Sequence, residues 1–258
     1  MAVVEAVTEG GAARSGGDLN SVVRKVQAII EALAFSPKPL GLSELSRRSG
    51  ISKPTAYRLC QELLDWGVIE QVHRKFRLGA RLYELGNHVP TRRRLRDAAL
   101  PFMEDLFVAT NQTIHLAVLD GREVLYVDRI SGSRSDRAPS AVVGRMPMHC
   151  TATGKCLLAF SDAEVVREYL ADPLEARTAF TVTVPRLLFE QLVQARKEGY
   201  AFEREELFLG YASVAAPVIG RDGTVVAAVS ITSGTSHFDL DRLLPPLRTA
   251  TRALGRQL

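Results

Sequence analysis

The sequence predicts an α+β protein in which an N-terminal winged helix-turn-helix is followed by a linker helix and by a domain built on an antiparallel sheet. Residues 22–78 show amphipathic helical patterns and then a hairpin pattern, which is the order found in a winged helix. Later residues show apolar strands joined by short turns, with helices before, between and after them. A length of 258 residues is enough for two such domains.

Charge is distributed unevenly along the chain. Residues 1–96 hold 16 Lys and Arg against 9 Asp and Glu, a formal charge of +7, whereas residues 97–258 hold 17 against 20, a formal charge of −3. A basic front on a slightly acidic body indicates a nucleic-acid module joined to a second module. The alternative is a chance fluctuation in solvated surface charge.

Composition excludes several other classes. Hydrophobic residues make up 46% and charged residues 24%, which is neither disordered nor fibrous. No apolar run reaches the roughly 20 residues that span a bilayer, and the first 18 residues lack the basic start of a signal peptide. Three cysteines without CxxC spacing argue against a disulfide scaffold or a cysteine-based zinc site. We therefore expect a cytoplasmic protein.

The chain is expected to begin with a disordered tail at residues 1–18, which are small, glycine-rich and without periodicity. Asp18 or Asn20 can cap the helix that follows. Ser36, which precedes a proline, should end that helix. The helix carries one buried stripe at 3–4 spacing, formed by Val22, Val23, Val26, Ile29, Ile30 and Leu33.

Residues 42–67 predict a helix-turn-helix. Ser43 can cap a short helix that ends at Gly50, where a residue tolerant of positive φ is favoured. Ser52 can cap the next helix, with Pro54 in its first turn. This second helix is expected to bury Ala56, Leu59, Cys60 and Leu63 and to present a polar, basic face.

The polar face and the following hairpin predict contacts with DNA. Residues 68–72 alternate like a strand, residues 73–75 form a polar tip, and residues 76–78 return, which is the pattern of a wing. Arg58 has the reach to pair with a guanine. The other contacts are expected to hold phosphates or thymine methyl groups, through Ser52, Lys53, Thr55, Tyr57, Arg74 and Lys75. The alternative is that these charges only solubilise a helix.

A linker helix is predicted over residues 85–111. Leu95, Ala98, Phe102 and Leu106 share one side of it, and Pro101 should bend or interrupt it. The linker also carries a dense basic run made of Arg92, Arg93, Arg94 and Arg96. We favour a solvated or dimer-facing helix surface for this run over contacts with flanking phosphates.

The C-terminal half predicts an antiparallel sheet with helices. Residues 113–119 and 123–130 read as a hairpin over Asp120 and Gly121, followed by a polar loop at residues 131–140. Further helices are expected at residues 153–160, 162–170, 186–197 and 240–257. Further strands are expected at residues 181–184, 211–219 and 225–231.

Specific motifs in this half resemble a known family. They are the segment Gly144–Ala159, which reads GRMPMHCTATGKCLLA, then Gly199-Tyr200, Glu205-Glu206 and the segment Gly210–Pro217. Together with the winged helix they resemble the IclR family of bacterial transcription regulators, over roughly residues 19–255. The resemblance implies a winged-helix DNA-binding domain at 19–84, a linker helix at 85–111 and a GAF/PAS-like effector-binding domain at 112–258.

The resemblance also implies the partners. It implies binding to double-stranded operator DNA that a small-molecule effector controls, by homodimers that pair into tetramers. A small organic or aromatic acid is the expected effector. The family supplies no catalysis, so we expect no enzyme activity and no cofactor.

An effector site is expected at the start of the helix at residues 153–160. Backbone N–H groups at a helix N-terminus, together with hydroxyls, hold small acids, and Thr153 and Gly154 lie there. The resemblance adds Glu203, Ser213, Ser230 and Thr232. Glu203 departs from the family's usual aspartate and Ser213 from its usual cysteine. Each of these polar groups has the alternative role of a locally satisfied strand or loop residue.

The residues of this half also raise four other possibilities. An enzyme would need His149 to activate Cys150 or Cys156, but no third orienting group and no GxSxG or HExxH motif is present. A redox-sensing regulator that uses Cys150 or Cys156 is the main alternative, and it requires an exposed thiolate of low pKa. The five histidines are scattered without ligand spacing, so no metal site is predicted. The TGK sequence before Cys156 lacks P-loop spacing.

Overall fold

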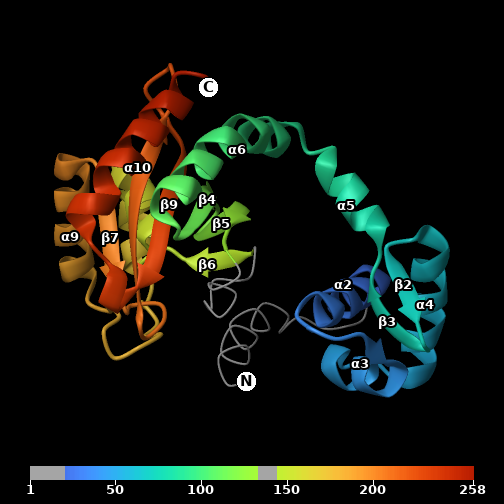
Figure 1. Cartoon of the computed structure of the whole chain (residues 1–258). Coiled ribbons are helices and arrows are strands. Elements are labelled where there is room, and N and C mark those ends of the chain that lie inside the picture. Colours follow the sequence, from blue (N-terminus) through green and yellow to red (C-terminus); the bar gives the residue numbers. More distant parts are fainter. Residues whose placement is uncertain (1–20, 133–143) are drawn as a thin grey trace. The chain divides into compact units, whose positions relative to one another are not determined.

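We describe the fold from a computed structural model, in which residues 21–132 and 144–258 are placed (Figure 1). The predicted tail at residues 1–18 and residues 133–140 of the predicted loop lie outside the described residues. The chain divides into two compact units at the junction of Arg93 and Arg94. No helix in the described ranges has the length and apolar character needed to cross a membrane.

The first unit is a winged helix-turn-helix, as predicted. Its sheet has three antiparallel strands in the order β1-β3-β2, and Val72 of β2 pairs with Lys75 of β3 to close the wing. The elements in chain order are α2 (Val22–Ala34), β1 (Leu40–Gly41), α3 (Leu42–Ser49), α4 (Lys53–Trp66), β2 (Ile69–Val72) and β3 (Lys75–Leu78).

The helix caps of this unit differ in part from the prediction. The N-cap of α2 is Ser21, whose hydroxyl accepts the N–H of Arg24 at 3.1 Å, and not Asp18 or Asn20. The N-cap of α3 is Gly41, so Ser43 lies inside the helix. The reason is that Leu40 and Gly41 pair with β3, and α3 begins directly after this short strand.

The hydrophobic core of the first unit confirms the predicted stripe of α4. Ala56, Leu59, Cys60 and Leu63 are all buried, and they pack in one cluster with residues of α2, α3 and β3. Gly50 ends α3 and Gly67 ends α4, both with positive φ, as the C-cap pattern requires. This packing leaves the opposite, polar face of α4 at the surface.

The linker consists of two helices and not of the single helix predicted over residues 85–111. They are α5 (Ala80–Asn87) and α6 (Pro90–Thr110), with a break at His88 and Val89. Pro90 accounts for the break, because a residue that precedes proline disfavours the helical conformation while proline itself suits a first turn. Pro101 lies inside α6 and does not interrupt it.

The second unit contains a six-stranded antiparallel sheet in the order β6-β5-β4-β9-β8-β7. This confirms the predicted sheet, but two of its strands, β6 and β7, were not predicted. The strands are β4 (Thr113–Asp120), β5 (Glu123–Ile130), β6 (Arg145–Pro147), β7 (Ala201–Arg204), β8 (Tyr211–Ile219) and β9 (Val225–Gly234).

The strand predicted at residues 181–184 is wrong. The hydroxyl of Thr181 accepts the N–H groups of Arg177 and Thr178 at 3.0 and 2.9 Å, and it donates to the carbonyl of Glu206 at 2.6 Å. A threonine that closes a turn in this way holds the segment out of the sheet.

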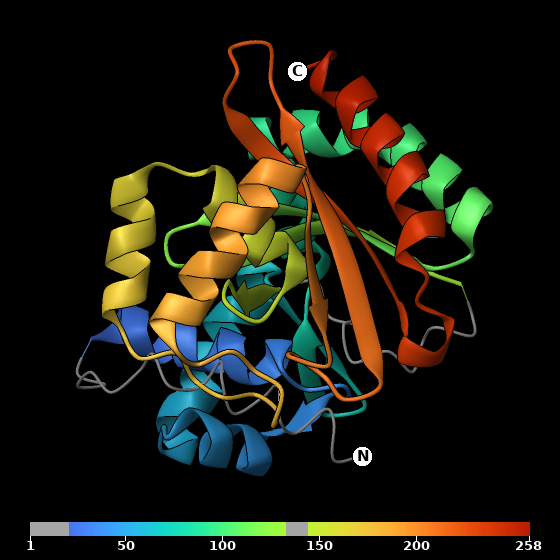
Figure 2. The same ribbon diagram turned by 90° about the vertical axis from the view of Figure 1, so that its left-hand side faces the viewer.

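Helices cover both faces of the sheet, as Figure 2 shows for α9 on one side and for α10 and α6 on the other. Alternate residues along each strand point to opposite faces. Ala215 and Ala228 thus pack toward α7 and α9, whereas Val214, Val229 and Ile231 pack toward α6 and α10. The remaining elements are α7 (Ala152–Phe160), α8 (Ala163–Ala171), α9 (Pro185–Glu198), the 3-10 turn η3 (Thr235–His237) and α10 (Leu240–Gly255).

Candidate functional site

The first candidate site is the polar face of α4. Ser52 is the N-cap residue, but its hydroxyl bonds to the hydroxyl of Thr55 at 3.0 Å and not to a backbone N–H. Lys53, Tyr57 and Arg58 are exposed, and Thr55 is half-buried. The structure therefore brings all five predicted residues to the leading turns of one helix, with Arg58 free to extend away from the core.

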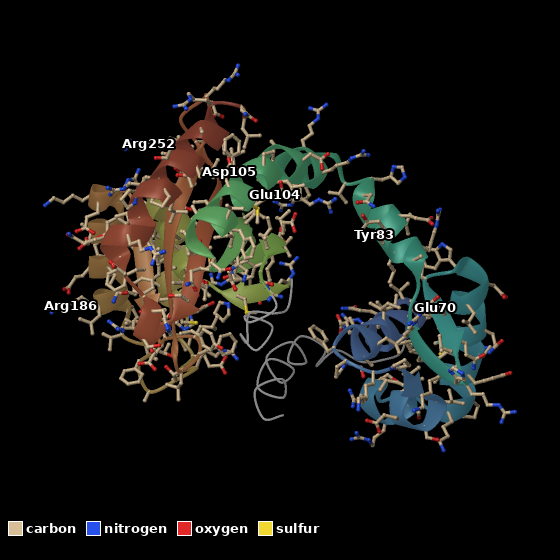
Figure 3. All side chains as sticks on the ribbon, viewed as in Figure 1. Glu70, Tyr83, Glu104, Asp105, Arg186 and Arg252 are labelled. Atoms are coloured by element: carbon tan, nitrogen blue, oxygen red, sulfur yellow. The ribbon has the colours of Figure 1, made fainter. Side chains whose placement is uncertain are left out.

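The wing presents the other two predicted residues. His73 and Arg74 form the two-residue turn between β2 and β3, with φ values of 48° and 61°, and Lys75 is the first residue of β3. The side chains of Arg74 and Lys75 are both exposed. Behind the turn, Glu70 and Arg77 pair across the two strands, and Figure 3 labels Glu70 on the wing. The wing therefore carries its free basic charges at the tip.

The basic run of α6 has a mixed environment. Arg93 and Arg94 are exposed, while Arg96 is half-buried and lies 3.9 Å from the carboxylate of Asp128 on β5. At least this member of the run therefore faces the sheet of the second unit.

The second candidate site is a cavity in the second unit with about 390 Å³ of empty space, part of it open to solvent. It brings together five of the six residues predicted for an effector. Its lining consists of Tyr126, Thr151, Ala152, Thr153, Glu203, Leu207, Phe208, Tyr211, Ser213, Ser230 and Thr232.

The register of the sheet explains how distant residues meet in this cavity. Glu203 of β7 is opposite Ser213 of β8, and Ser213 is opposite Thr232 of β9. The hydroxyls of Ser213 and Thr232 lie 2.9 Å apart. Ser230 is two residues before Thr232 and therefore points to the same face. Three neighbouring strands thus carry one polar row against α7.

The N-terminus of α7 forms the other wall. The Thr151 hydroxyl accepts the N–H of Gly154 at 3.1 Å and donates to the carbonyl of Pro147 at 2.8 Å. Among the described residues, the N–H groups of Ala152 and Thr153 have no hydrogen-bond acceptor, as expected for the first turn of a helix. The hydroxyl of Thr153 lies 3.1 Å from that of Tyr126. Two backbone donors and two hydroxyls therefore meet at one end of the cavity.

Gly154 does not line the cavity, in contrast to the role predicted for it. Its N–H is used by Thr151, and a Cβ built on it would lie 2.4 Å from both Cα and O of Met148. The absence of a side chain lets α7 approach the segment before it. Gly154 therefore supports the site through packing.

Gly154→Ala is expected to lower the free energy of unfolding of the second unit by about 1–3 kcal/mol, because the new methyl group meets rigid backbone. Urea denaturation measures this. The matched control is Gly86→Ala in α5, where nothing lies within 4 Å of the new Cβ. There alanine should leave stability unchanged or raise it by about 1 kcal/mol. Equal effects of the two substitutions would contradict the packing role.

Glu203 is the charged group of the cavity, and only 4% of it is exposed. Its carboxylate accepts the N–H of Glu206 at 3.0 Å. Burial raises the pKa of Glu203 to about 7, against the lowering effects of Ser213 and of the Glu206 N–H. Glu203 can therefore hold a proton near neutral pH and donate a hydrogen bond.

A buried ion pair lies beside Glu203. The ammonium group of Lys155 on α7 pairs with the carboxylate of Glu206, and their side chains are 2% and 8% exposed. The second carboxylate oxygen of Glu206 is buried without a hydrogen-bond partner among the described residues. The pair ties the loop after β7 to α7. Leu207 and Phe208 of that loop line the cavity, so the pair also holds part of its wall.

Sequence reasoning missed several lining residues. Tyr126 shares a sheet face with Val124, so strand alternation was a usable signal for it. Burial raises the pKa of Tyr126 to about 12, so its hydroxyl remains a donor. Leu207, Phe208 and Tyr211 belong to a loop and a strand end, where no periodicity marks them.

The cysteines do not meet the requirement of a redox sensor. Cys150 and Cys156 are both buried. Burial raises the pKa of the Cys150 thiol to about 12 and that of the Cys156 thiol further. An exposed thiolate of low pKa is what such a sensor needs, so the structure gives this alternative no support.

His149 does not act as a base toward these thiols. Its Nδ1 lies 3.0 Å from the Tyr169 hydroxyl and its Nε2 lies 2.8 Å from the carbonyl of Glu175. Both ring nitrogens are therefore engaged, and burial lowers the pKa of His149. Within residues 21–132 and 144–258, no three His, Cys, Asp or Glu side chains gather in a way that could hold a metal ion.

Comparison with known proteins identifies both units. Residues 22–73 match the IclR helix-turn-helix domain, and residues 87–258 match the C-terminal domain of the bacterial transcriptional regulator IclR. The chain is 34% identical to the HTH-type transcriptional regulator KdgR of Escherichia coli over 247 residues, which are 93% of this chain and 94% of that protein. It is also 34% identical to XynR of the same organism over 246 residues, 93% of this chain and 97% of that protein.

Solved structures agree. An IclR homologue from Microbacterium hydrocarbonoxydans, in complex with 4-hydroxybenzoate, is similar with a TM-score of 0.83 and 30% identity over 91% of this chain and 98% of that one. The IclR of Thermotoga maritima is similar with a TM-score of 0.74 and 30% identity over 91% and 98%. The relatives are transcriptional regulators and not enzymes, in agreement with the missing catalytic motifs. The chain belongs to the IclR family of bacterial transcriptional regulators, as a DNA-binding regulator with a C-terminal effector-binding domain.

Proposed function

We propose that this regulator binds a small organic acid, preferably an aromatic one, in the cavity of the second unit, and that the acid controls its affinity for operator DNA in the cytoplasm. The observation that carries this is the pair of free N–H groups of Ala152 and Thr153 at the N-terminus of α7, which line a cavity together with hydroxyl and aromatic side chains. Such a helix end favours a carboxylate through its N–H groups and its dipole. The similar structure that holds 4-hydroxybenzoate supports an acid of this class.

The cavity has a distinct place for each part of such a ligand. The carboxylate would accept hydrogen bonds from the two N–H groups and from the Thr153 hydroxyl. Tyr126, Phe208 and Tyr211 supply aromatic walls for a ring. Glu203 would meet a ligand hydroxyl, because a carboxyl group whose pKa is raised to about 7 can donate a hydrogen bond to a hydroxyl or accept one from it, whereas its ionised form repels a second anion.

The sheet offers a direct route from the ligand to the linker. On β9, Ser230 and Thr232 line the cavity while Val229 and Ile231 pack on the opposite face, in one cluster with Leu95 and other residues of α6. A ligand in the cavity that shifts β9 would therefore also shift the side chains of β9 that pack against α6. Because coupling between two sites is reciprocal, operator DNA must change the ligand's affinity by the same factor. We further propose a homodimer that pairs into tetramers, since two winged units can read two half-sites.

The first experiment is a titration onto the DNA upstream of the protein's own gene and onto a scrambled fragment. Specific binding should be about 10³-fold tighter than non-specific binding. Among a panel of small acids that begins with 4-hydroxybenzoate, at least one should then shift the affinity for the operator.

Thr153→Val should weaken the binding of that acid about tenfold, because it removes a hydroxyl donor to a charged group. Thr249→Val, an exposed threonine on α10, is the matched control. An acid that binds equally well with and without operator would refute the coupling.

Base reading is proposed for Arg58 and phosphate binding for the wing. Arg58→Ala should cost about 1–3 kcal/mol of binding and relax the preference at one base position, whereas Lys75→Ala should weaken binding to all sequences alike. Fluorescence anisotropy with operator duplexes that each carry one changed base pair separates the two patterns. Uniform loss in both variants would overturn base reading by Arg58.

A further inference from the structure

A second concave site lies in the same unit, away from the effector cavity. It is a groove with about 620 Å³ of empty space, part of it open to solvent. It shares no lining residue with the effector cavity. The end of β8, the turn after it and the last turns of α10 form the walls, through Pro217, Ile219, Gly220, Arg221, Thr251, Arg252, Gly255 and Arg256.

One glycine determines how closely these walls approach. A Cβ built on Gly255 of α10 would lie 2.2 Å from the carbonyl oxygen of Ile219 on β8. The helix can therefore reach the strand end only because this position has no side chain. At this contact the backbone of α10 packs directly against the backbone of β8. Because no flexible side chain lies between them, the distance between the two walls of the groove is fixed.

Three guanidinium groups converge on the groove from its two walls. Arg252 lies in the last turn of α10, where Figure 3 labels it, and Arg256 is the C-cap residue of the same helix, four positions later. Arg221 comes from the turn between β8 and β9, and its Nε donates to the carbonyl of Arg256 at 3.0 Å. This bond orients Arg221 and leaves its two terminal nitrogens available. Within the described part of the chain, none of the three arginines pairs with a carboxylate.

The nearest acidic residue in the chain does not neutralise them. Asp222 follows Arg221, but one of its carboxylate oxygens accepts the N–H and the hydroxyl of Thr224 at 3.0 and 2.7 Å. Those hydrogen bonds lower the pKa of Asp222 and hold it on its own turn. Other arginines of this unit without a carboxylate partner donate to backbone carbonyls from separate places, as Arg196, Arg204 and Arg248 do, whereas Arg221, Arg252 and Arg256 line one groove.

Helix electrostatics explain only part of the cluster. Cations near a helix C-terminus are stabilised by its dipole, which accounts for Arg252 and Arg256. It does not account for Arg221, which comes from the other wall and adds a third like charge. Like charges one helical turn apart repel each other. A bound anion would relieve this concentration of positive charge.

We propose that this groove is a binding site for a small phosphorylated anion with two or three phosphate groups, such as a nucleotide polyphosphate or a free polyphosphate. Planar guanidinium groups match phosphate oxygens two at a time, and three of them provide the opposing charge for an anion of this size. The groove lies open between the end of β8 and the end of α10, so a soluble anion can reach all three arginines. The regulator would then receive a second signal, independent of the acid in the effector cavity.

The test is isothermal titration of the full-length protein with inorganic triphosphate, ATP and ADP at about 150 mM salt, where weak surface charge effects are screened. Saturable binding of triphosphate is expected. Tighter binding of ATP than of triphosphate would identify a nucleotide, and equal binding would identify the phosphate chain alone.

Variants locate the site. Arg221→Ala and Arg252→Ala should each weaken triphosphate at least about tenfold, and Arg252→Lys should also weaken it because the two-pronged contact is lost. The matched control is Arg242→Ala, an exposed arginine at the other end of α10, which should change affinity less than about twofold. Thr153→Val, which affects only the effector cavity, should leave triphosphate binding unchanged, so failure of this proposal is separable from failure of the proposed function.

Three outcomes would overturn the proposal. They are no saturable binding of any of the three anions, an equal loss in Arg242→Ala and Arg252→Ala, and a loss of duplex-DNA affinity in Arg252→Ala without any triphosphate binding to the unmodified protein. The last outcome would assign the groove to DNA phosphates instead.

Discussion

Lys155→Met is expected to lower the free energy of unfolding of the second unit by about 3–5 kcal/mol. The substitution keeps the aliphatic stem of Lys155 but removes the ammonium group, so the carboxylate of Glu206 stays buried without its cation. One oxygen of that carboxylate already lacks a hydrogen-bond partner among the described residues. Urea denaturation followed by circular dichroism measures the change.

Two further variants make this result specific. Lys155→Met combined with Glu206→Leu should recover most of the lost stability, because a buried ion pair exchanged for apolar side chains is often neutral. Arg167→Ala breaks the exposed pair of Arg167 with Glu164 and should cost less than about 1 kcal/mol. A Lys155→Met protein as stable as Arg167→Ala would show that Glu206 takes up a proton or reaches solvent instead.

Glu203→Gln is expected to raise the free energy of unfolding above that of the unmodified protein, and this difference should grow as pH rises. Burial raises the pKa of Glu203 from 4.5 to about 7 in the folded state. Below pH 4.5 the group is protonated both folded and unfolded, so it has no effect. Between pH 4.5 and about 7 the folded state binds the extra proton, so the stability of the unmodified protein falls as pH rises. Glutamine cannot ionise, so this loss disappears.

The difference in free energy of unfolding between Glu203→Gln and the unmodified protein should therefore grow by about 3 kcal/mol between pH 4.5 and pH 8. Denaturation curves at four or five pH values measure it. Glu205→Gln is the control from the same loop, since Glu205 is only half-buried. A constant difference across this range would mean that Glu203 is ionised throughout and that its charge is compensated in the folded state.

Local signals in the sequence were enough for most of the first unit. The buried stripe of α4 and the glycines at 50 and 67 follow from helical periodicity and from the need for positive φ, both of which are local properties. The cap at Gly41 was missed because pairing of β1 with β3 determines where α3 begins. That pairing joins residues about 35 positions apart, which periodicity does not report.

The residues of the candidate effector cavity were predicted for a different reason. Thr153 lies at a helix start, but Glu203, Ser213, Ser230 and Thr232 came from family resemblance. Their proximity depends on the register of β7, β8 and β9, which alternation along a single strand does not specify. Gly154 was assigned to the ligand because a small residue at a helix start fits both a binding role and a packing role. Only the position of Met148 distinguishes the two.

Alternate side chains of β8 and β9 point to opposite faces of the sheet, so the residues of the cavity can change without changing the residues of the core on the other face. Ser213 and Thr232 touch the cavity, while their chain neighbours Val214 and Ile231 belong to the core on the other face. Under the proposed function, a designer of biosensors can therefore randomise the cavity positions and screen for new effectors while the residues that pack against α6 stay unchanged. The same separation would let natural descendants acquire new effectors by single substitutions.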